Sequence, residues 1–148
     1  MRIVSVSQDF LDVCAPVDSE LLLKRGRPCV VVLRLQYKGK RYDFAVPMRS
    51  NIAPNVPKNQ YFPLPPRPST KTYHRHGLHY IKMFPISKNY QEKFRVEGNL
   101  YYENLARIIE KEKKRIIGEC QEYLTNYEQY GKPRYAVDID VIIKTLCL

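Results

Sequence analysis

The chain has no long hydrophobic run. Nowhere in its 148 residues is there an uninterrupted apolar stretch of about 18 residues, the length that spans a bilayer. The N-terminal segment 1–9 is broken by polar residues too early to form the apolar core of a signal peptide. We therefore expect a cytoplasmic protein that neither enters a membrane nor is exported.

Paired cysteines are also missing. The four cysteines, Cys14, Cys29, Cys120 and Cys147, are scattered, and no two of them form a C-x-x-C pair. This spacing argues against a zinc ribbon and against a disulfide framework. We expect four reduced thiols.

The common signatures of several enzyme classes are absent. The sequence has no P-loop, no dinucleotide-binding glycine motif and no nucleophile elbow. Acidic residues are scarce in the middle of the chain, where residues 24–96 contain only Asp43 and Glu92. Because magnesium-dependent nucleases use clustered carboxylates, a nuclease built on this segment is predicted to need neither a metal ion nor another cofactor.

Positive charge is concentrated where the acids are scarce. Residues 24–96 contain 16 Lys and Arg residues, so that this segment carries +14 of charge while the whole chain carries +10. A field this localised is typical of proteins that bind polyanions. Non-catalytic RNA binding, ribosome association and charge that only aids solubility all remain open at this point.

The apolar pattern predicts the strands. Residues 2–6 form a short first strand, and residues 29–37 and 41–47 flank a turn at Gly39 and predict a hairpin. The continuous apolar stretch 30–33 predicts a central strand buried on both faces, and the alternation in 41–47 places the second strand nearer an edge. Another strand is expected from Leu78 to Pro85.

Helices are predicted at both ends of the chain. Apolar residues spaced by three and four from Leu100 onward predict one long amphipathic helix, capped by Asn99 and ended by Gly131 and Pro133. Short helices are expected after the cap residues Ser7 and Asp138. The length and the mixture of elements predict a single α+β domain over residues 1–148, with the sheet packed against the long helix and the shorter ones.

Between Pro47 and Pro68 the chain has seven prolines. Proline lacks a backbone N–H, so this density disfavours helix and central strand and predicts a long extended loop. The polar residues Arg49, Ser50 and Asn51 lie where the second hairpin strand meets this loop, a position at which a sheet holds functional side chains rigidly. An ordinary turn explains Ser50 and Asn51 equally well.

All three histidines lie within six residues, as His74, His76 and His79. Histidine exchanges a proton near neutral pH, as RNA cleavage through the 2′-OH requires, which makes His79 a candidate acid or base. Zinc binding would need further ligands that the surrounding sequence lacks. A solvated loop remains open for His74 and His76, and a buried structural role remains open for His79.

Aromatic residues interleave with the basic ones in this region, a mixture suited to stacking unpaired bases while neutralising phosphates. Each tyrosine taken singly is as readily a packing residue. The residues predicted to contact RNA are Lys24, Arg25, Arg27, Lys58, Arg67, Lys71, Tyr73, His74, Arg75, His76, Lys82 and Tyr102.

Three short motifs, Lys38-Gly-Lys-Arg-Tyr, Phe44-Ala-Val-Pro-Met-Arg-Ser and Gly77-Leu-His-Tyr-Ile-Lys-Met-Phe-Pro-Ile, resemble the ToxN/AbiQ family of type III toxins, and in particular its CptN branch. The resemblance implies a compact, strongly bent, barrel-like antiparallel sheet related to that of other ribonuclease toxins. It implies metal-independent cleavage of cellular or phage RNA to a 2′,3′-cyclic phosphate. It also implies phage defence, inhibition by a repeated pseudoknot antitoxin RNA, and a ring-like protein–RNA assembly.

The same resemblance implies positions for the catalytic groups. The family's active-site serine falls on Ser50, its neighbouring threonine on Arg49, and its tyrosine in the first helical turn on Tyr101 or Tyr102. The family's lysine two residues after the serine is replaced here by Ile52. Arg49, Lys82 or a cation between Lys24 and Arg27 would therefore neutralise the transition-state charge, with Ser50 and Asn51 positioning the phosphate.

Overall fold

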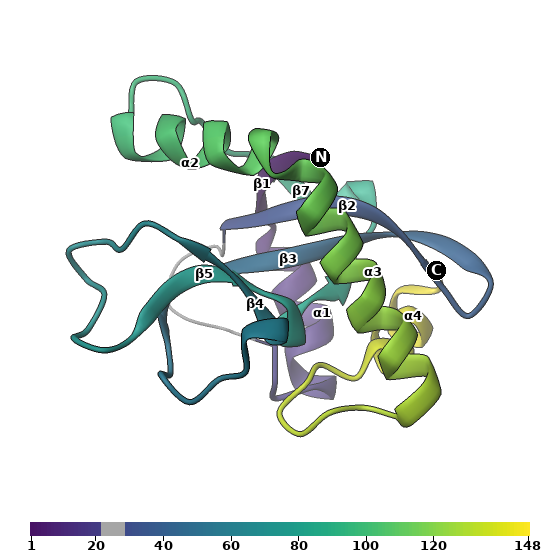
Figure 1. The fold of residues 1–148 in the computed structure, drawn as a ribbon. Helices are drawn as coiled ribbons and strands as arrows, with labels where there is room; N and C mark the ends of the chain where they lie inside the picture. The colour runs from purple at the N-terminus through teal and green to yellow at the C-terminus, as the bar shows by residue number, and fades with distance from the viewer. Residues whose placement is uncertain (22–28) are drawn as a thin grey trace.

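A computed structural model describes residues 1–21 and 29–148. The strands are β1 (Arg2–Val6), β2 (Cys29–Tyr37), β3 (Lys40–Ile52), β4 (Tyr61–Leu64), β5 (Arg75–His79), β6 (Phe84–Pro85) and β7 (Gln91–Lys93). The α-helices are α1 (Gln8–Cys14), α2 (Leu100–Lys111), α3 (Lys113–Tyr130) and α4 (Ile139–Leu146), and short 3-10 turns lie at η1 (Ala15–Val17), η2 (Lys58–Gln60), η3 (Tyr80–Lys82) and η4 (Lys88–Tyr90). Figure 1 shows their arrangement.

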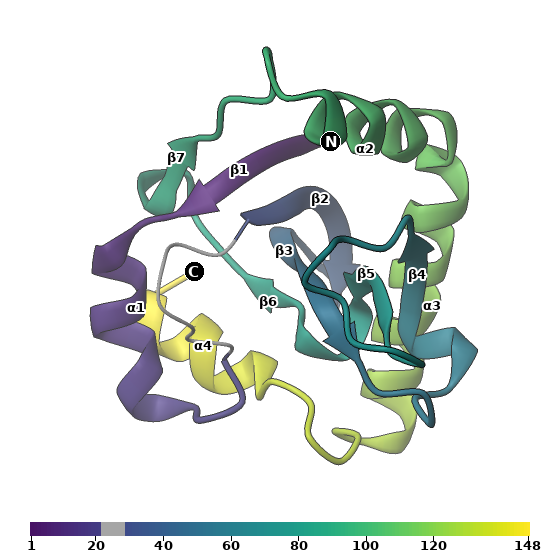
Figure 2. The same cartoon turned by 90° about the vertical axis from the view of Figure 1, so that its left-hand side faces the viewer.

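Within the described residues the seven strands form one antiparallel sheet. The strand order is β4-β5-β3-β2-β1-β7, and β6 pairs with β3 beside β5. The sheet stays open, with β4 and β7 at its two ends, so the α+β class and the antiparallel sheet are confirmed but the sheet does not close into a barrel. Helices α2 and α3 cover one side of the sheet and α1 and α4 the other (Figure 2).

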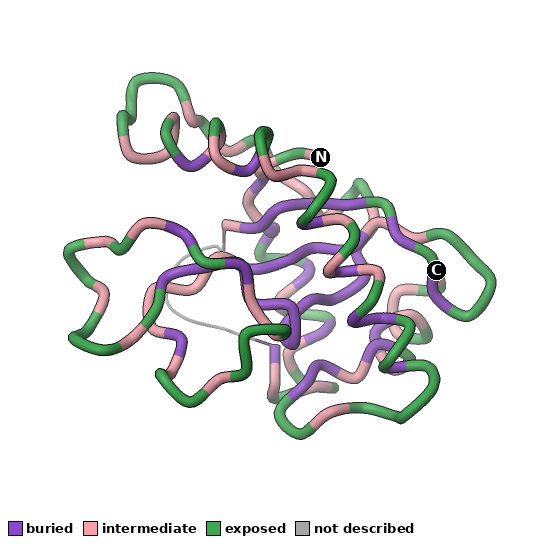
Figure 3. The backbone as a smooth tube through the Cα atoms, in the orientation of Figure 1, coloured by how far each residue is buried: buried purple, intermediate pink, exposed green. Residues whose placement is uncertain are grey.

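The β2 strand has the predicted central place. Val31 and Leu33 belong to the hydrophobic cluster under α2 and α3, whereas Val30 and Val32 belong to the cluster beside α1 and α4. Successive side chains of a strand point to opposite faces, so four consecutive apolar residues supply both cores. The buried tube through the middle of Figure 3 follows β2 and its neighbour β3.

The β3 strand differs from the prediction in length and place. It continues past Pro47 to Ile52, and it is flanked by β2 on one side and by β5 and β6 on the other, so it is not near an edge. Pro47 is the last residue paired with β2, and Met48 is the first paired with β5. The missing N–H of proline is tolerated at this change of partner.

Two other predictions were wrong, one made from the prolines and one from apolar alternation. Residues 61–64 form β4 despite Pro63, because β4 is an edge strand whose outer N–H groups need no partner. The strand expected from Leu78 to Pro85 is instead interrupted by η3, and β5 and β6 pair with successive parts of β3 on either side of that turn. The turn matters because it carries Lys82.

The predicted long helix is two helices. Glu112, with φ −97° and ψ 13°, lies outside the helical region and separates α2 from α3, which run in clearly different directions in Figure 1. The amphipathic pattern continues through the break, since Leu105 and Ile109 of α2 and Ile116 of α3 all join one core. The three predicted caps are confirmed: Ser7, Asn99 and Asp138 each accept a hydrogen bond from a backbone N–H in the first turn.

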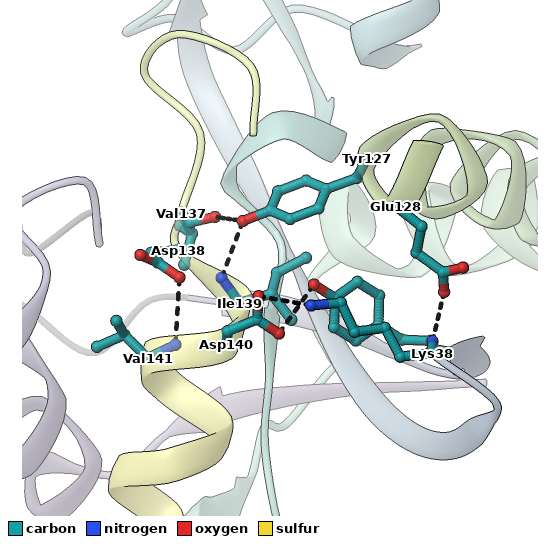
Figure 4. Close-up of polar contacts among 9 residues, drawn as sticks. Lys38, Tyr127, Glu128, Val137, Asp138, Ile139, Asp140 and Val141 are labelled. Atoms are coloured by element: carbon teal, nitrogen blue, oxygen red, sulfur yellow. Dashed lines mark hydrogen bonds and ion pairs between the residues drawn. The ribbon is translucent and has the colours of Figure 1, made fainter. Parts of the chain in front are cut away.

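Tyr127 of α3 fixes the segment that leads into α4. Its hydroxyl donates to the Val137 carbonyl at 3.0 Å and accepts from the Ile139 N–H at 3.1 Å (Figure 4). The β2–β3 turn is tied to the same region, because Lys38 Nζ lies 2.9 Å from Asp140 Oδ2 and the Lys38 N–H donates to Glu128. The loop before α4 is thereby held against the sheet.

Within residues 1–21 and 29–148, none of the helices combines the length and the hydrophobicity that crossing a bilayer requires.

Candidate active site and RNA-binding surface

A pocket of about 490 Å³ opens beside the last residues of β3. We call it the cationic pocket. Three predicted catalytic residues, Arg49, Asn51 and His79, line it together with the predicted RNA-binding residue Lys82. The structure thus gathers residues from β3, β5 and η3.

Strand pairing explains this meeting. Arg49 pairs with Gly77, two residues before His79, and the register shifts between Arg49 and Ile52. A β-bulge of this kind re-aims side chains near a site. Gly77 is required where it stands, because a Cβ there would lie 2.3 Å from the Phe62 carbonyl oxygen of β4.

His79 accepts a hydrogen bond from Arg49, with Nη1 and Nδ1 3.2 Å apart. A guanidinium only donates, so Nδ1 is the acceptor and the ring proton of neutral His79 lies on Nε2. Nε2 is buried and lacks a partner among the described residues. Burial, followed by the charges of Arg49 and Lys82, lowers the pKa of His79 to about 3, so the ring is neutral at physiological pH.

Lys82 is buried and already paired. Its Nζ lies 2.5 Å from Glu20 Oε2 and donates to the Tyr135 carbonyl at 2.7 Å. Burying an ammonium without such partners would be costly. Arg134 also lines the pocket, so three cations face one carboxylate among its described lining residues, and the pocket favours an anion.

Asn51 connects the pocket to the β4–β5 loop. Its side-chain oxygen accepts from the Lys71 N–H at 2.8 Å, which leaves the amide NH₂ to donate elsewhere. Ser50, between Arg49 and Asn51, is not a lining residue of the pocket. Ile52 is fully buried and its Cδ1 packs near Gly77, so the position that holds a lysine in the family supplies no cation here.

A second group of predicted residues lies near the start of α2. The Arg67 guanidinium lies 5.4 Å from the Tyr101 ring centroid and 5.7 Å from that of Tyr102. His76 is buried, with Nδ1 2.8 Å from the Pro65 carbonyl and 2.7 Å from the Tyr101 hydroxyl. Burial lowers the pKa of His76 and raises that of Tyr101 to about 12. The tyrosines form an aromatic surface with a cation over it, suited to stacking.

The other predicted RNA contacts are spread out. Lys71, Tyr73 and His74 lie in the loop between β4 and β5, and Arg75 begins β5. Tyr73 is 80% exposed. Lys58, in η2, lines a different pocket from that of Arg49. Lys24, Arg25 and Arg27 lie outside the described residues.

Among the pocket residues that sequence reasoning missed are Glu20, Arg134 and Tyr135. Tyr135 has φ +67°, which is uncommon for a residue other than glycine and is often found at functional sites. Its ring is exposed and lies 4.8 Å from the Arg134 guanidinium carbon. The adjacent Arg134-Tyr135 pair is the same combination of basic and aromatic residues that predicted RNA binding around the three histidines, but no sequence signal marks Glu20.

No group of three or more His, Cys, Asp or Glu side chains in residues 1–21 and 29–148 is placed to hold a metal ion. Cys14 and Cys120 are buried free thiols, and burial raises the pKa of Cys14 to about 11.

No protein-family model matches the chain, and no curated protein matches it by sequence. Solved structures do match. One comes from work on a processed non-coding RNA that regulates a bacterial antiviral system; it has a TM-score of 0.73 and 14% identity over 97% of this chain and 96% of that one. Another is AbiQ, a lactococcal anti-phage endoribonuclease belonging to the type-III toxin-antitoxin system, with a TM-score of 0.73 and 10% identity over 99% of this chain and 96% of AbiQ. Neither match is specific to the CptN branch, but both span nearly the whole chain, which therefore has the fold of the ToxN/AbiQ toxins.

Proposed function

We propose that residues 1–148 form a single endoribonuclease toxin domain of a type III toxin-antitoxin system. The observation that carries the proposal is the cationic pocket, where Arg49, Asn51 and His79 meet on a fold shared with AbiQ. A pocket with excess positive charge suits a phosphodiester, and cleavage of RNA through its own 2′-OH needs charge stabilisation at the phosphorus.

In the proposed reaction the 2′-oxygen attacks the adjacent phosphorus and the bond from phosphorus to the 5′-oxygen breaks. The 2′-OH loses its proton, the departing 5′-oxygen gains one, and a 2′,3′-cyclic phosphate remains. The Arg49 guanidinium stabilises the charge that develops on the phosphoryl oxygens, and the Asn51 amide donates to the same phosphate. Ser50 lies between the two in β3 but outside the lining of the cationic pocket, so its hydroxyl is given no contact with this phosphate.

We assign His79 a positioning role in place of acid–base chemistry. Its Nδ1 holds Arg49 at 3.2 Å, and its lowered pKa keeps the ring neutral. A positioning role predicts that His79→Gln, which retains an acceptor, preserves more activity than His79→Phe. It also predicts that the pH profiles of the cleavage rate of the wild-type protein and of His79→Gln have the same shape between pH 5 and 8.

We further propose that a repeated pseudoknot RNA is the antitoxin and that RNA and toxin form a ring-like assembly. Two candidate RNA-binding areas support this: the cationic pocket, and the surface of Arg67, Tyr101 and Tyr102, with the β4–β5 loop joining them. A protein with two such areas is able to join successive RNA units.

Product chemistry tests the catalytic proposal. Purified protein is incubated with a long RNA in the presence of EDTA, and the new 3′ ends are analysed for cyclic phosphate. Cyclic-phosphate ends that increase with time are expected. Binding without cleavage would instead identify a non-catalytic RNA-binding or ribosome-associated protein.

A further inference from the structure

A second pocket lies next to the cationic one. It has a volume of about 420 Å³ and is lined by residues of η2 and α3. Gln60 and Pro133 line both pockets, so the two are direct neighbours. A chain bound with its phosphate in the cationic pocket would therefore place an adjacent group in the second one.

The charges of the second pocket balance among the lining residues that the structure describes. Lys58 and Arg115 face Glu119 and Glu122. The Arg115 guanidinium is paired with Glu119, because its Nε lies 2.8 Å from Glu119 Oε2. Glu119 also accepts a hydrogen bond from the Tyr80 hydroxyl at 2.8 Å. We call this the neutral pocket; its charge gives no preference for a phosphate.

The lining chemistry fits a nucleobase. Tyr130, at the end of α3, is 77% exposed, so its ring is available for stacking. The side-chain amides of Asn59, Gln60 and Asn126 offer both donors and acceptors. Tyr123 is buried in the pocket lining, and its hydroxyl has no hydrogen-bond partner among the described residues. This hydroxyl is closed off from solvent, so a bound base would contact Tyr130, the amides and Glu122 instead.

Glu122 gives the pocket a direction of preference. An ionised carboxylate only accepts hydrogen bonds, and it recognises bases through their amino groups, as at cytosine N4. Adenine, guanine and cytosine carry an exocyclic amino group, whereas uracil carries an oxygen in its place. The oxygen would face the Glu122 carboxylate unfavourably.

We propose that the neutral pocket binds the base of the nucleotide next to the scissile phosphate, and that it selects bases with an exocyclic amino group. Tyr130 stacks on the base and Glu122 accepts from its amino group. This proposal rests on the proposed function only in taking the neighbouring cationic pocket as the site of the scissile phosphate.

The test uses fluorescently labelled hexamers of deoxycytidine and deoxyuridine, which lack the 2′-OH and cannot be cleaved by 2′-OH attack. Their bases differ at position 4, which is an amino group in cytosine and an oxygen in uracil, and at N3, which accepts a hydrogen bond in cytosine and donates one in uracil. By fluorescence anisotropy the protein should bind the deoxycytidine hexamer about tenfold more tightly, the ratio that corresponds to about 1.4 kcal/mol. Glu122→Gln should abolish this ratio, and the control Glu110→Gln, an exposed helical glutamate outside both pockets, should retain it.

Tyr130 supplies the second arm. Tyr130→Ala should weaken the binding of both hexamers about tenfold, and Tyr130→Phe, which keeps the ring, should not. Equal affinity for the two hexamers, or a ratio that survives in Glu122→Gln, would overturn the proposal. Because binding is measured without cleavage, the two proposals can fail separately. Base discrimination by a protein that cuts no RNA would refute the nuclease proposal and support the base-binding site. Cleavage of RNA without base discrimination would refute the base-binding site and support the nuclease proposal.

Discussion

The stability of the protein should fall on mild acidification because of His79. The pKa of this ring drops from its ordinary 6.5 to about 3 in the folded state, chiefly through burial. Between these values the unfolded chain binds a proton that the folded chain does not. The stabilising contribution is therefore complete above pH 6.5 and is lost progressively as the pH falls toward 3.

The size of the loss in stability follows from the interval between the two pKa values of His79. Each pH unit below 6.5 costs about 1.4 kcal/mol, so that pH 5 should lower the free energy of unfolding by about 2 kcal/mol relative to pH 8. The neighbouring His76, whose pKa is also lowered by burial, contributes in the same direction. Urea titrations at the two pH values measure the sum, and about 2 kcal/mol corresponds to about 1 M in the urea midpoint.

The His79→Gln variant isolates the histidine. Its glutamine still accepts from Arg49 but does not titrate, so the difference between pH 8 and pH 5 should shrink by about 2 kcal/mol. A His79→Gln protein with the full acid sensitivity would show that His79 is not a buried neutral ring, and the assignment of its Nδ1 as the acceptor for Arg49 would fail with it.

Three further predictions concern the proposed chemistry and the strands that support it. Arg49→Ala should slow single-turnover RNA cleavage about a hundredfold or more, because one donor to the developing charge is worth about 3 to 4 kcal/mol. The control Arg107→Ala, at an exposed position, should cleave RNA normally. Full activity in Arg49→Ala would remove Arg49 from the mechanism. Cleavage should persist in excess EDTA, and complete, zinc- or magnesium-reversible inhibition would contradict the metal-free proposal. Gly77→Ala should destabilise the fold by about 3 kcal/mol in urea titrations, because its Cβ would meet the Phe62 carbonyl oxygen. The control Gly118→Ala, in open space on α3, should stabilise the fold by about 0.5 to 1 kcal/mol. Equal stabilities of the two variants would mean that β4 shifts freely.

The sequence by itself determined the local elements. Apolar alternation and turn chemistry gave β2 and the start of β3, and the caps Ser7, Asn99 and Asp138 marked the starts of three helices. These signals were sufficient because each depends on backbone groups within a few residues of one another. The localised charge of residues 24–96 likewise needs no structure to be read.

Only the tertiary structure decided which side chains share a site. The partner of Lys82 is Glu20, 62 residues away, and Arg134 reaches the same pocket from the loop that Tyr127 fixes. The extension of β3 past Pro47 also depended on distant strands, because proline is tolerated where β5 takes over from β2. Pairings of this kind are set by the packing of whole elements, and periodicity within one segment carries no information about them.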